Sequence, residues 1–220
     1  FGGGEMMGGG MGAPSMGGFE MVAPAAQDGI NAYRAAPAEN GHMLVIWTGP
    51  DAEASQKVAA HLHEETKLQF VETPLQDVVE YLQNLHDIPI LVNRAELDSS
   101  GIDPELTITV NIESLSLPVA LDQMTRQHNL GWYIAGGALV ITSYDEANLR
   151  LSNRIYKLNQ LDAVGAAKVI TKVISPESWS EQGGKANLAV IRDRNLLVIR
   201  QNREGHEAIE SLLTQLEQLK

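Results

Sequence analysis

From residue 51 onward, short segments with a helical spacing of apolar residues and short segments with strand alternation follow one another, and their order limits the folds open to the chain. Residues 51–147 predict a helix and then the order β-α-β-β-α-β-β, and residues 151–220 predict β-α-β-β-α. Strands and helices are therefore mixed without strict β-α alternation. We predict an α+β fold of two small domains, each with its helices on one face of a sheet.

Local signals for turns and helix ends support the order in residues 51–147. Thr73 is a good N-cap, Pro74 suits the first position of a helix, and Gln76 completes a capping box. Gly136 and Gly137 lie between two apolar triplets, which is a strong signal for a tight hairpin. These residues predict where one helix begins and where two strands pair.

Two segments of this region, 67–71 and 107–112, alternate apolar and polar residues and are predicted to be strands. They are our candidates for exposed sheet edges, and the alternative is that both lie inside a sheet. The polar stretch 93–105 contains Gly101 and Pro104 and is predicted to be a loop.

In residues 151–220, two polar residues stand before apolar runs with helical spacing. We predict these residues, Asp162 and Asn202, to be helix N-caps. Residues 193–195 separate two short apolar runs and predict a second hairpin.

Residues 1–50 differ in composition from the rest, with nine Gly and four Met among residues 1–18. Such a segment has little to bury and a large backbone entropy to lose, so we predict a flexible arm, with a single strand possible at 43–47. We expect the arm to contact a neighbouring subunit, where Met side chains fill irregular gaps. The candidate interface residues, which include one from the last domain, are Met6, Met7, Met11, Met16, Phe19, Trp47 and Trp179.

Charge and composition exclude several functions. The formal net charge of -12 argues against a nucleic-acid partner, because phosphate binding needs clustered Lys and Arg. The absence of cysteine excludes disulfides, thiolate metal sites and a cysteine nucleophile. Apolar runs are too short for a membrane span, so none is predicted.

Two groups of residues resemble metal sites. The four Met of residues 6–16 are thioethers, which suit Cu(I) but select it weakly without His or Cys. His61 and Glu65 can share a metal on a helix, whereas His61 and His63 point to opposite sides. We favour an apolar arm in the first case and an exposed polar helix face in the second. We therefore predict no metal and no cofactor.

Pairs of carboxylates raise the question of acid-base catalysis, which needs two carboxylates that face each other across a cleft. Asp77 and Glu80 lie on a predicted helix, and Asp98 and Asp103 lie in a predicted loop. Residues 183–185, Gly-Gly-Lys, lack the spacing of a phosphate-binding loop and predict a turn. We predict that the chain is not an enzyme.

Five sequence runs stand out in the order of elements between residues 66 and 145: LQFVETPLQDVV (68–79), ILV (90–92), LPVALDQM (117–124), GWYI (131–134) and LVI (139–141). In these runs and in its order of elements, this region resembles the short N-terminal domain (STN) shared by secretins and TonB-dependent receptors. Residues 151–220 resemble the KH-like, ring-building domains that follow this module in secretins. The resemblance implies docking domains of the periplasm.

From these observations we expect a non-catalytic protein–protein interaction and self-assembly module of a bacterial envelope or surface structure. Its expected partners are further copies in a ring or fibre and other envelope proteins, in the periplasm or outside the cell. The alternative is a receptor-like signalling domain that binds a soluble regulator as a monomer. A third, weaker hypothesis is a small-ligand or sugar-binding domain, which requires an apolar pocket with convergent polar groups.

Overall fold

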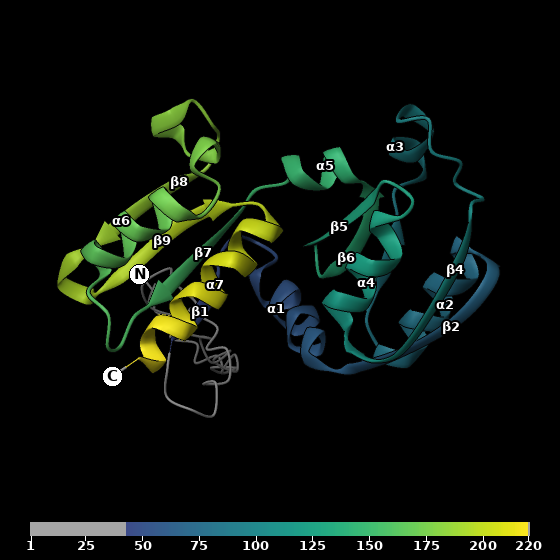
Figure 1. Ribbon diagram of the computed structural model, residues 1–220, viewed down its shortest axis with the longest axis horizontal. Coiled ribbons are helices and arrows are strands. Elements are labelled where there is room, and N and C mark those ends of the chain that lie inside the picture. Colours follow the sequence, from purple (N-terminus) through teal and green to yellow (C-terminus); the bar gives the residue numbers. More distant parts are fainter. Residues whose placement is uncertain (1–42, 220) are drawn as a thin grey trace, which may run out of the picture. The chain divides into compact units, whose positions relative to one another are not determined.

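The structure is a computed structural model that describes residues 43–219, all within one compact unit of residues 32–220 (Figure 1). Four short 3-10 turns accompany the helices and strands. In chain order, the helices and strands are β1 (Leu44–Trp47), α1 (Ala52–Ala60), β2 (Glu65–Pro74), α2 (Leu75–His86), β3 (Ile90–Val92), α3 (Arg94–Ser99), β4 (Thr107–Ser116), α4 (Leu117–Arg126), β5 (Leu130–Ala135), β6 (Ala138–Ser143), α5 (Tyr144–Leu149), β7 (Ser152–Lys157), α6 (Ala163–Val173), β8 (Asn187–Ile191), β9 (Leu196–Gln201) and α7 (Arg203–Gln218).

This order confirms the predicted α+β class and both predicted patterns of strands and helices, with α3 and α5 as additional elements. Residues 52–149, here called the first half, hold a two-stranded antiparallel sheet of β2 and β4 and a three-stranded sheet in the order β3-β6-β5. In the second sheet β3 runs parallel to β6, and β5 runs antiparallel to it. Each half has its own cluster of buried apolar side chains. Separate domains with boundaries at 51–147 and 151–220 stay a prediction.

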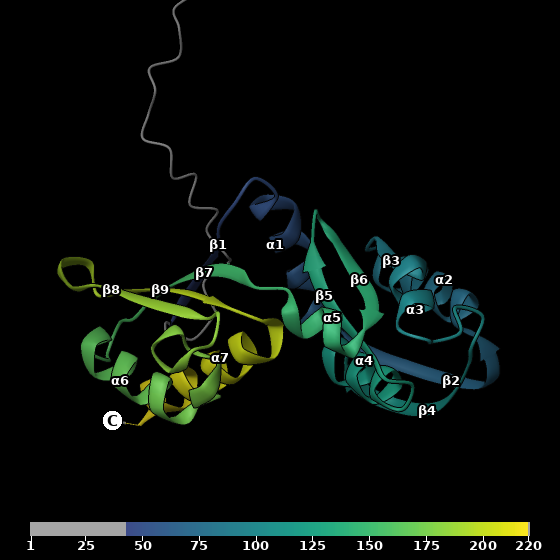
Figure 2. The same ribbon diagram turned by 90° about the horizontal axis from the view of Figure 1, so that it is seen from above.

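The second half consists of residues 152–218 together with β1. Its antiparallel sheet has the order β1-β7-β9-β8, so β1 pairs with β7 although the whole first half lies between them in the sequence. Figure 2 shows β1 beside β7. From the end of β1 the chain leads into α1. Val45 of β1 packs against the second core, whose centre includes Tyr156 and Leu197. The apolar run at 43–47 thus extends this sheet by one strand.

Several local predictions are confirmed. Gly136 and Gly137 have φ angles of 60° and 74° and connect β5 to β6, because two residues with positive φ match the twist of a tight hairpin. The side chain of Asp162 accepts a hydrogen bond from the Gly165 N–H at 2.7 Å and caps α6. Asn202 caps α7 in the same way.

The predicted capping box at the start of α2 is wrong. Thr73 and Pro74 pair with Ile108 and Thr107 as the last residues of β2, and the helix begins at Leu75 without a side-chain cap. The Thr73 hydroxyl instead donates to the Val71 backbone oxygen at 3.4 Å. The pairing with β4 therefore outweighs the local preference for a cap.

The predicted loop at 93–105 also contains a helix. Asn93 accepts a hydrogen bond from the Glu96 N–H at 3.3 Å, and α3 follows directly. Leu97 is fully buried in the first core. The short helix α3 points the Leu97 side chain into the core. The polar composition of the segment did not predict this helix.

The Gly183-Gly184 pair forms a turn, and each position requires glycine for a different reason. Gly183 has a φ of 90° and open space at the Cβ position, whereas a Cβ on Gly184 would lie 1.9 Å from the Ser178 backbone oxygen. We expect Gly184→Ala to lower the free energy of unfolding by about 2–3 kcal/mol, because the turn must move away from fixed backbone. Chemical denaturation measures the loss.

Gly183→Ala is the matched control, with an expected loss of about 1 kcal/mol from its backbone angle alone. A larger loss for Gly183→Ala than for Gly184→Ala would contradict this account of the turn.

Candidate functional site

Five of the predicted interface residues lie outside the described residues. Met6, Met7, Met11, Met16 and Phe19 all precede residue 43, so their contacts stay a prediction.

The two predicted interface tryptophans that the structure describes lie in different environments. Trp179 is 2% exposed and belongs to the second core, and its Nε1 donates to the Ile174 backbone oxygen at 2.8 Å. The expectation that Trp179 forms a surface contact is corrected, because its ring is used inside the fold. Trp47 is half-buried at the end of β1 and borders a pocket.

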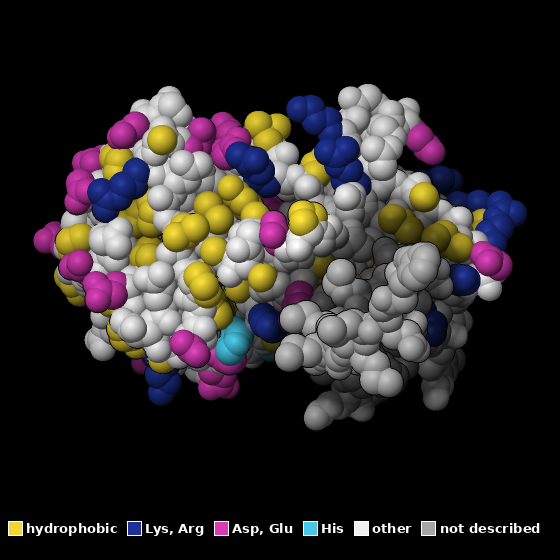
Figure 3. All heavy atoms as spheres, turned by 180° about the vertical axis from the view of Figure 1, so that it is seen from behind, with side chains coloured by type: hydrophobic (Ala, Val, Ile, Leu, Met, Phe, Trp, Pro, Cys, Tyr) yellow, Lys and Arg dark blue, Asp and Glu magenta, His cyan; other side chains and the backbone are white. Residues whose placement is uncertain are grey.

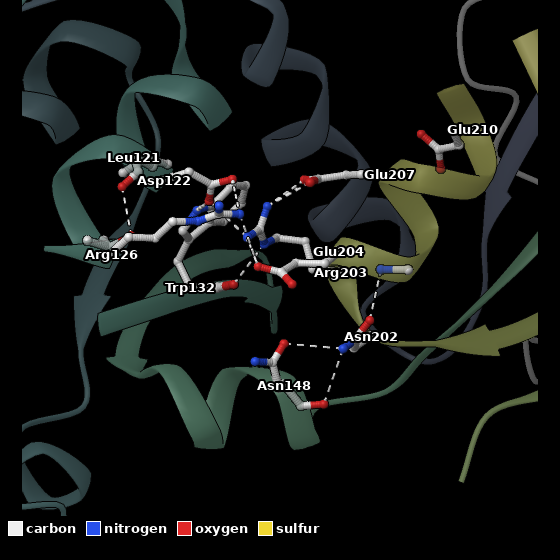
Figure 4. Close-up of polar contacts among 12 residues, drawn as sticks. Leu121, Asp122, Arg126, Trp132, Asn148, Asn202, Arg203, Glu204, Glu207 and Glu210 are labelled. Atoms are coloured by element: carbon white, nitrogen blue, oxygen red, sulfur yellow. Dashed lines mark hydrogen bonds and ion pairs between the residues drawn. The ribbon is translucent and has the colours of Figure 1, made fainter. Parts of the chain in front are cut away.

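Arg203, the first residue of α7, joins the two halves (Figure 4). Its Nε donates to the Trp132 backbone oxygen at 3.1 Å, and its Nη2 donates to Asp122 Oδ1 at 2.9 Å. Its Nη1 donates to both carboxylate oxygens of Glu207, at 2.8 and 2.7 Å. The guanidinium also stacks on the Trp132 ring at 4.1 Å, while Trp132 Nε1 donates to Asp122. All three nitrogens of the guanidinium therefore have partners.

Further polar contacts surround Arg203 and fasten the start of α7 to the first half. Asn202 Nδ2 donates to Asn148 Oδ1 at 3.2 Å. Arg126 Nη2 and the Tyr144 hydroxyl each donate to a carboxylate oxygen of Glu204 at 3.4 Å. These partners come from α4 and α5, as Figure 4 shows for Arg126 and Asn148.

Arg154 on β7 repeats the arrangement within the second half. Its guanidinium stacks on the Trp47 ring at 4.1 Å, and Nη1 donates to Glu210 Oε1 at 2.7 Å. The side chain is 8% exposed, and Nε is buried without a hydrogen-bond partner among the described residues. Each of the two arginines therefore stacks on a tryptophan and pairs with a glutamate of α7, and donor capacity is left over only at Arg154.

Two buried side chains, Tyr156 and His206, lie near Arg154. The Tyr156 hydroxyl lies 2.6 Å from His206 Nδ1 and 3.2 Å from Glu210 Oε1, and His206 Nε2 donates to the Ser152 backbone oxygen at 3.0 Å. Burial, with the nearby charge of Arg154, lowers the pKa of His206 to about 3. Burial and the charge of Glu210 raise the pKa of Tyr156. The pair is thus held neutral.

A pocket of about 700 Å³ lies at these two arginine–tryptophan stacks. Its wall comes from β1, α1, the following turn, α4, β5, β7 and α7 and is mostly apolar. Its lining residues are Met43, Leu44, Val45, Trp47, Gln56, Ala59, Ala60, Leu62, His63, Pro118, Trp132, Ile134, Arg154, Arg203, Glu207 and Glu210. An apolar wall with a few convergent polar groups is typical of a binding pocket.

The charged groups of this pocket are paired with one another. Both glutamates are paired with arginines, and burial, which Arg203 opposes, raises the pKa of Glu207. The lining residues, all in the described part of the chain, include no Ser, Thr, Cys or Lys to act as a nucleophile. The sequence signal for this site was weak, because its residues are scattered from 43 to 210.

The second candidate surface is the sheet of β2 and β4 (Figure 1). Each of these ten-residue strands has only the other as a neighbour in the described part of the chain, which confirms the predicted exposed edges. Glu72 has a φ of 49° at an irregularity of β2, and the neighbouring Val71 is 75% exposed. Shallow hollows of about 480 and 400 Å³ flank the pair, the first beside Tyr81.

The remaining chemical hypotheses find less support. His61 Nδ1 lies 2.8 Å from Glu64 Oε1 rather than at Glu65, and His86 Nδ1 lies 2.9 Å from the other oxygen of Glu64. Within residues 43–219, no group of three or more His, Cys, Asp or Glu side chains is placed to hold a metal ion. Among the described helices, none combines the length and apolar character that a membrane crossing needs.

Comparisons with known proteins give low similarity. No family model matches the sequence, and no curated protein does. Among solved structures, the chain is similar to the N-terminal domain of the secretin XcpQ from Pseudomonas aeruginosa, with 16% identity and a TM-score of 0.26 over 71% of this chain and 67% of that one. It is also similar to the type IV competence pilus secretin PilQ of V. cholerae, with 15% identity and a TM-score of 0.29 over 68% and 38%. A third match is the Klebsiella pneumoniae type II secretion system outer membrane complex of PulD, PulS and the PulC HR domain, with 11% identity and a TM-score of 0.30 over 68% and 26%.

The structural neighbours are thus secretin N-terminal domains at low sequence identity. This chain spans about two thirds of the XcpQ structure and less than half of the other two chains. Identities and TM-scores of this size carry no argument about function. The assignment of the two halves to the short N-terminal domain and to the KH-like domain stays a prediction.

Proposed function

We propose that this chain is a non-catalytic protein–protein interaction and self-assembly module of a bacterial envelope or surface structure, periplasmic or extracellular. One observation carries the proposal: β2 and β4 form a two-stranded sheet whose outer edges have no neighbouring strand in the described part of the chain. An unpaired strand exposes a row of N–H and C=O groups, onto which another chain can add a strand.

Surface composition supports the same proposal. Val71 on β2 and Leu91 on β3 are 75% and 56% exposed, and Leu85 on α2 is 45% exposed. Hydrophobic side chains gather over the first half on the face drawn in Figure 3. Apolar area of this kind commonly marks a contact with another protein. The proposed partners are further copies of this chain, in a ring or fibre, and other envelope proteins.

Self-association of the full chain tests the proposal. Sedimentation velocity over a range of concentrations is expected to show assembly that Val71→Lys weakens by about tenfold, because a charge must then be buried beside the edge of β2. Val71 is exposed, so the substitution leaves the fold intact.

Val173→Lys is the matched control, because Val173 is also exposed, at 61%, but lies on α6 in the second half of the chain, whereas β2 lies in the first half. A chain that stays monomeric at every concentration would contradict self-assembly and favour the receptor-like alternative. Equal weakening by both substitutions would contradict the role of the β2 edge.

A further inference from the structure

The pocket at Trp47 and Trp132 contains no residue of β2 or β4, so its ligand is a separate question from the partner of those strands. Its volume of about 700 Å³ is that of a site for a small ligand or a short peptide segment. Two tryptophans, Leu62 and Ile134 supply its apolar wall. A ligand must therefore offer apolar groups of adaptable shape.

Charge narrows the class of ligand further. The charged lining residues are Arg154 and Arg203 against Glu207 and Glu210, and each arginine is already paired with one glutamate. A charged ligand would break one of these pairs or lie against a like charge. A neutral ligand avoids both.

One polar feature of the site still lacks a partner. Arg154 is 8% exposed, its Nη1 donates to Glu210, and its Nε is buried without a hydrogen-bond partner among the described residues. Arg203, with a similar stack on Trp132, uses all three of its nitrogens. Arg154 lines the pocket and keeps this one donor without an acceptor, and a neutral acceptor such as a backbone carbonyl can pair with it once the guanidinium turns toward the pocket.

The chain itself contains a segment with these properties. Residues 6–18 read MMGGGMGAPSMGG and carry no charged side chain. Glycines let the backbone and its carbonyl groups approach closely, and methionine thioethers make favourable contacts with aromatic rings. A stretch of 24 residues separates this segment from Met43 at the rim of the pocket, and a chain of that length can extend up to roughly 80 Å. This reach is sufficient for a second molecule.

We propose that the pocket formed by β1, α1, β5 and α7 binds the Met-rich segment 6–18 of a second copy of the chain. Methionine side chains lie against the apolar wall at Trp47 and Trp132, and Arg154 donates to a backbone carbonyl of the segment. The choice of a second copy rests on the proposed self-assembly. Each copy then supplies one segment and one pocket, which is a head-to-tail contact and extends into a ring or a fibre.

Site-specific cross-linking in the full chain tests this contact, and the absence of natural cysteine makes single-cysteine variants unambiguous. One tagged copy carries Met11→Cys, and a copy of different size carries Ala60→Cys at the pocket rim. A short bismaleimide is expected to link the two copies. The control partner carries Lys57→Cys, on α1 but outside the lining, and is expected to give several-fold less product.

A second substitution asks whether the pocket itself is filled. Ala59→Phe on the Ala60→Cys copy places a ring in the pocket, and we expect it to lower the yield of cross-linked product by about tenfold, as the loss of one apolar anchor does. Equal yields with and without Ala59→Phe would overturn the proposal.

Sedimentation of the same samples separates the two proposals. If the copies assemble but Ala60→Cys gives no more product than Lys57→Cys, the pocket proposal is wrong and self-assembly stands. If the copies do not assemble, both proposals are wrong. A cross-link formed only within a single chain carrying both Met11→Cys and Ala60→Cys would overturn the contact between copies.

Discussion

Replacing Arg203 with methionine is expected to lower the free energy of unfolding by about 3–5 kcal/mol, the cost of removing one partner from a buried ion pair. Arg203 is 10% exposed and holds Asp122, Glu207 and the Trp132 backbone oxygen at once. Methionine fills a similar volume but leaves Glu207 without its cation and Asp122 with only Arg126, at 3.6 Å. Chemical denaturation, followed by two spectroscopic signals whose transitions are compared, measures the change.

The same experiment addresses how the halves are coupled. Arg203 donates a hydrogen bond to Asp122, which lies 81 residues earlier in the sequence. Its loss therefore removes a link between the two halves, each of which has its own hydrophobic core. If the halves are separate domains, we expect the variant to unfold in two transitions. Arg192→Met, at an exposed position, is the control and should change stability by no more than about 0.5 kcal/mol. A loss below about 1 kcal/mol for Arg203→Met would contradict the structural role of this residue.

Acid is expected to destabilise the protein through His206, by about 1.4 kcal/mol for each pH unit below 6.5. Burial, with the charge of Arg154, lowers the pKa of His206 in the folded state to about 3, while the unfolded histidine takes up a proton near its usual value of 6.5. Between these values the unfolded state binds more protons, so stability is full above pH 6.5 and falls as the pH decreases. The loss over the first two units is about 3 kcal/mol.

His206→Gln tests this assignment, because glutamine keeps polar atoms beside Tyr156 but does not titrate. We expect the variant to start less stable and to lose less stability between pH 6.5 and pH 4.5. Glu207 acts in the opposite direction, since its raised pKa makes the folded state take up a proton more readily. His63→Gln, at an exposed side chain, is the control. Equal pH slopes for the wild type and His206→Gln would rule out this origin of the acid sensitivity.

Features that depend on a few consecutive residues were predictable. Asp162 and Asn202 cap α6 and α7, because the side chain and the N–H that it accepts from are three residues apart. Gly136 and Gly137 turn between β5 and β6 for a similarly local reason. The strands themselves, β2 and β4, followed from the alternation of apolar and polar residues, whereas their unpaired edges were settled by the sheet topology.

Features that depend on a distant partner were not predictable. Thr73 is a good N-cap residue, yet it pairs with Ile108 in the β2–β4 ladder, because seven paired positions outweigh one side-chain hydrogen bond. Trp179 stands in a turn-rich segment, yet it is buried, because Gly184 allows the turn to close onto Ser178. Neither partner is visible from the local pattern.

The sequence by itself determined the α+β class, the order of strands and helices, and most of the caps and turns, because these depend on periodicity and on contacts within one or two turns of chain. Only the tertiary structure decided that β1 joins the sheet of the second half and that Arg203 reaches Asp122. It also brought Trp47 and Trp132 to one pocket. These contacts join residues many positions apart, and they are chosen by which apolar faces pack together, a choice that no local pattern encodes.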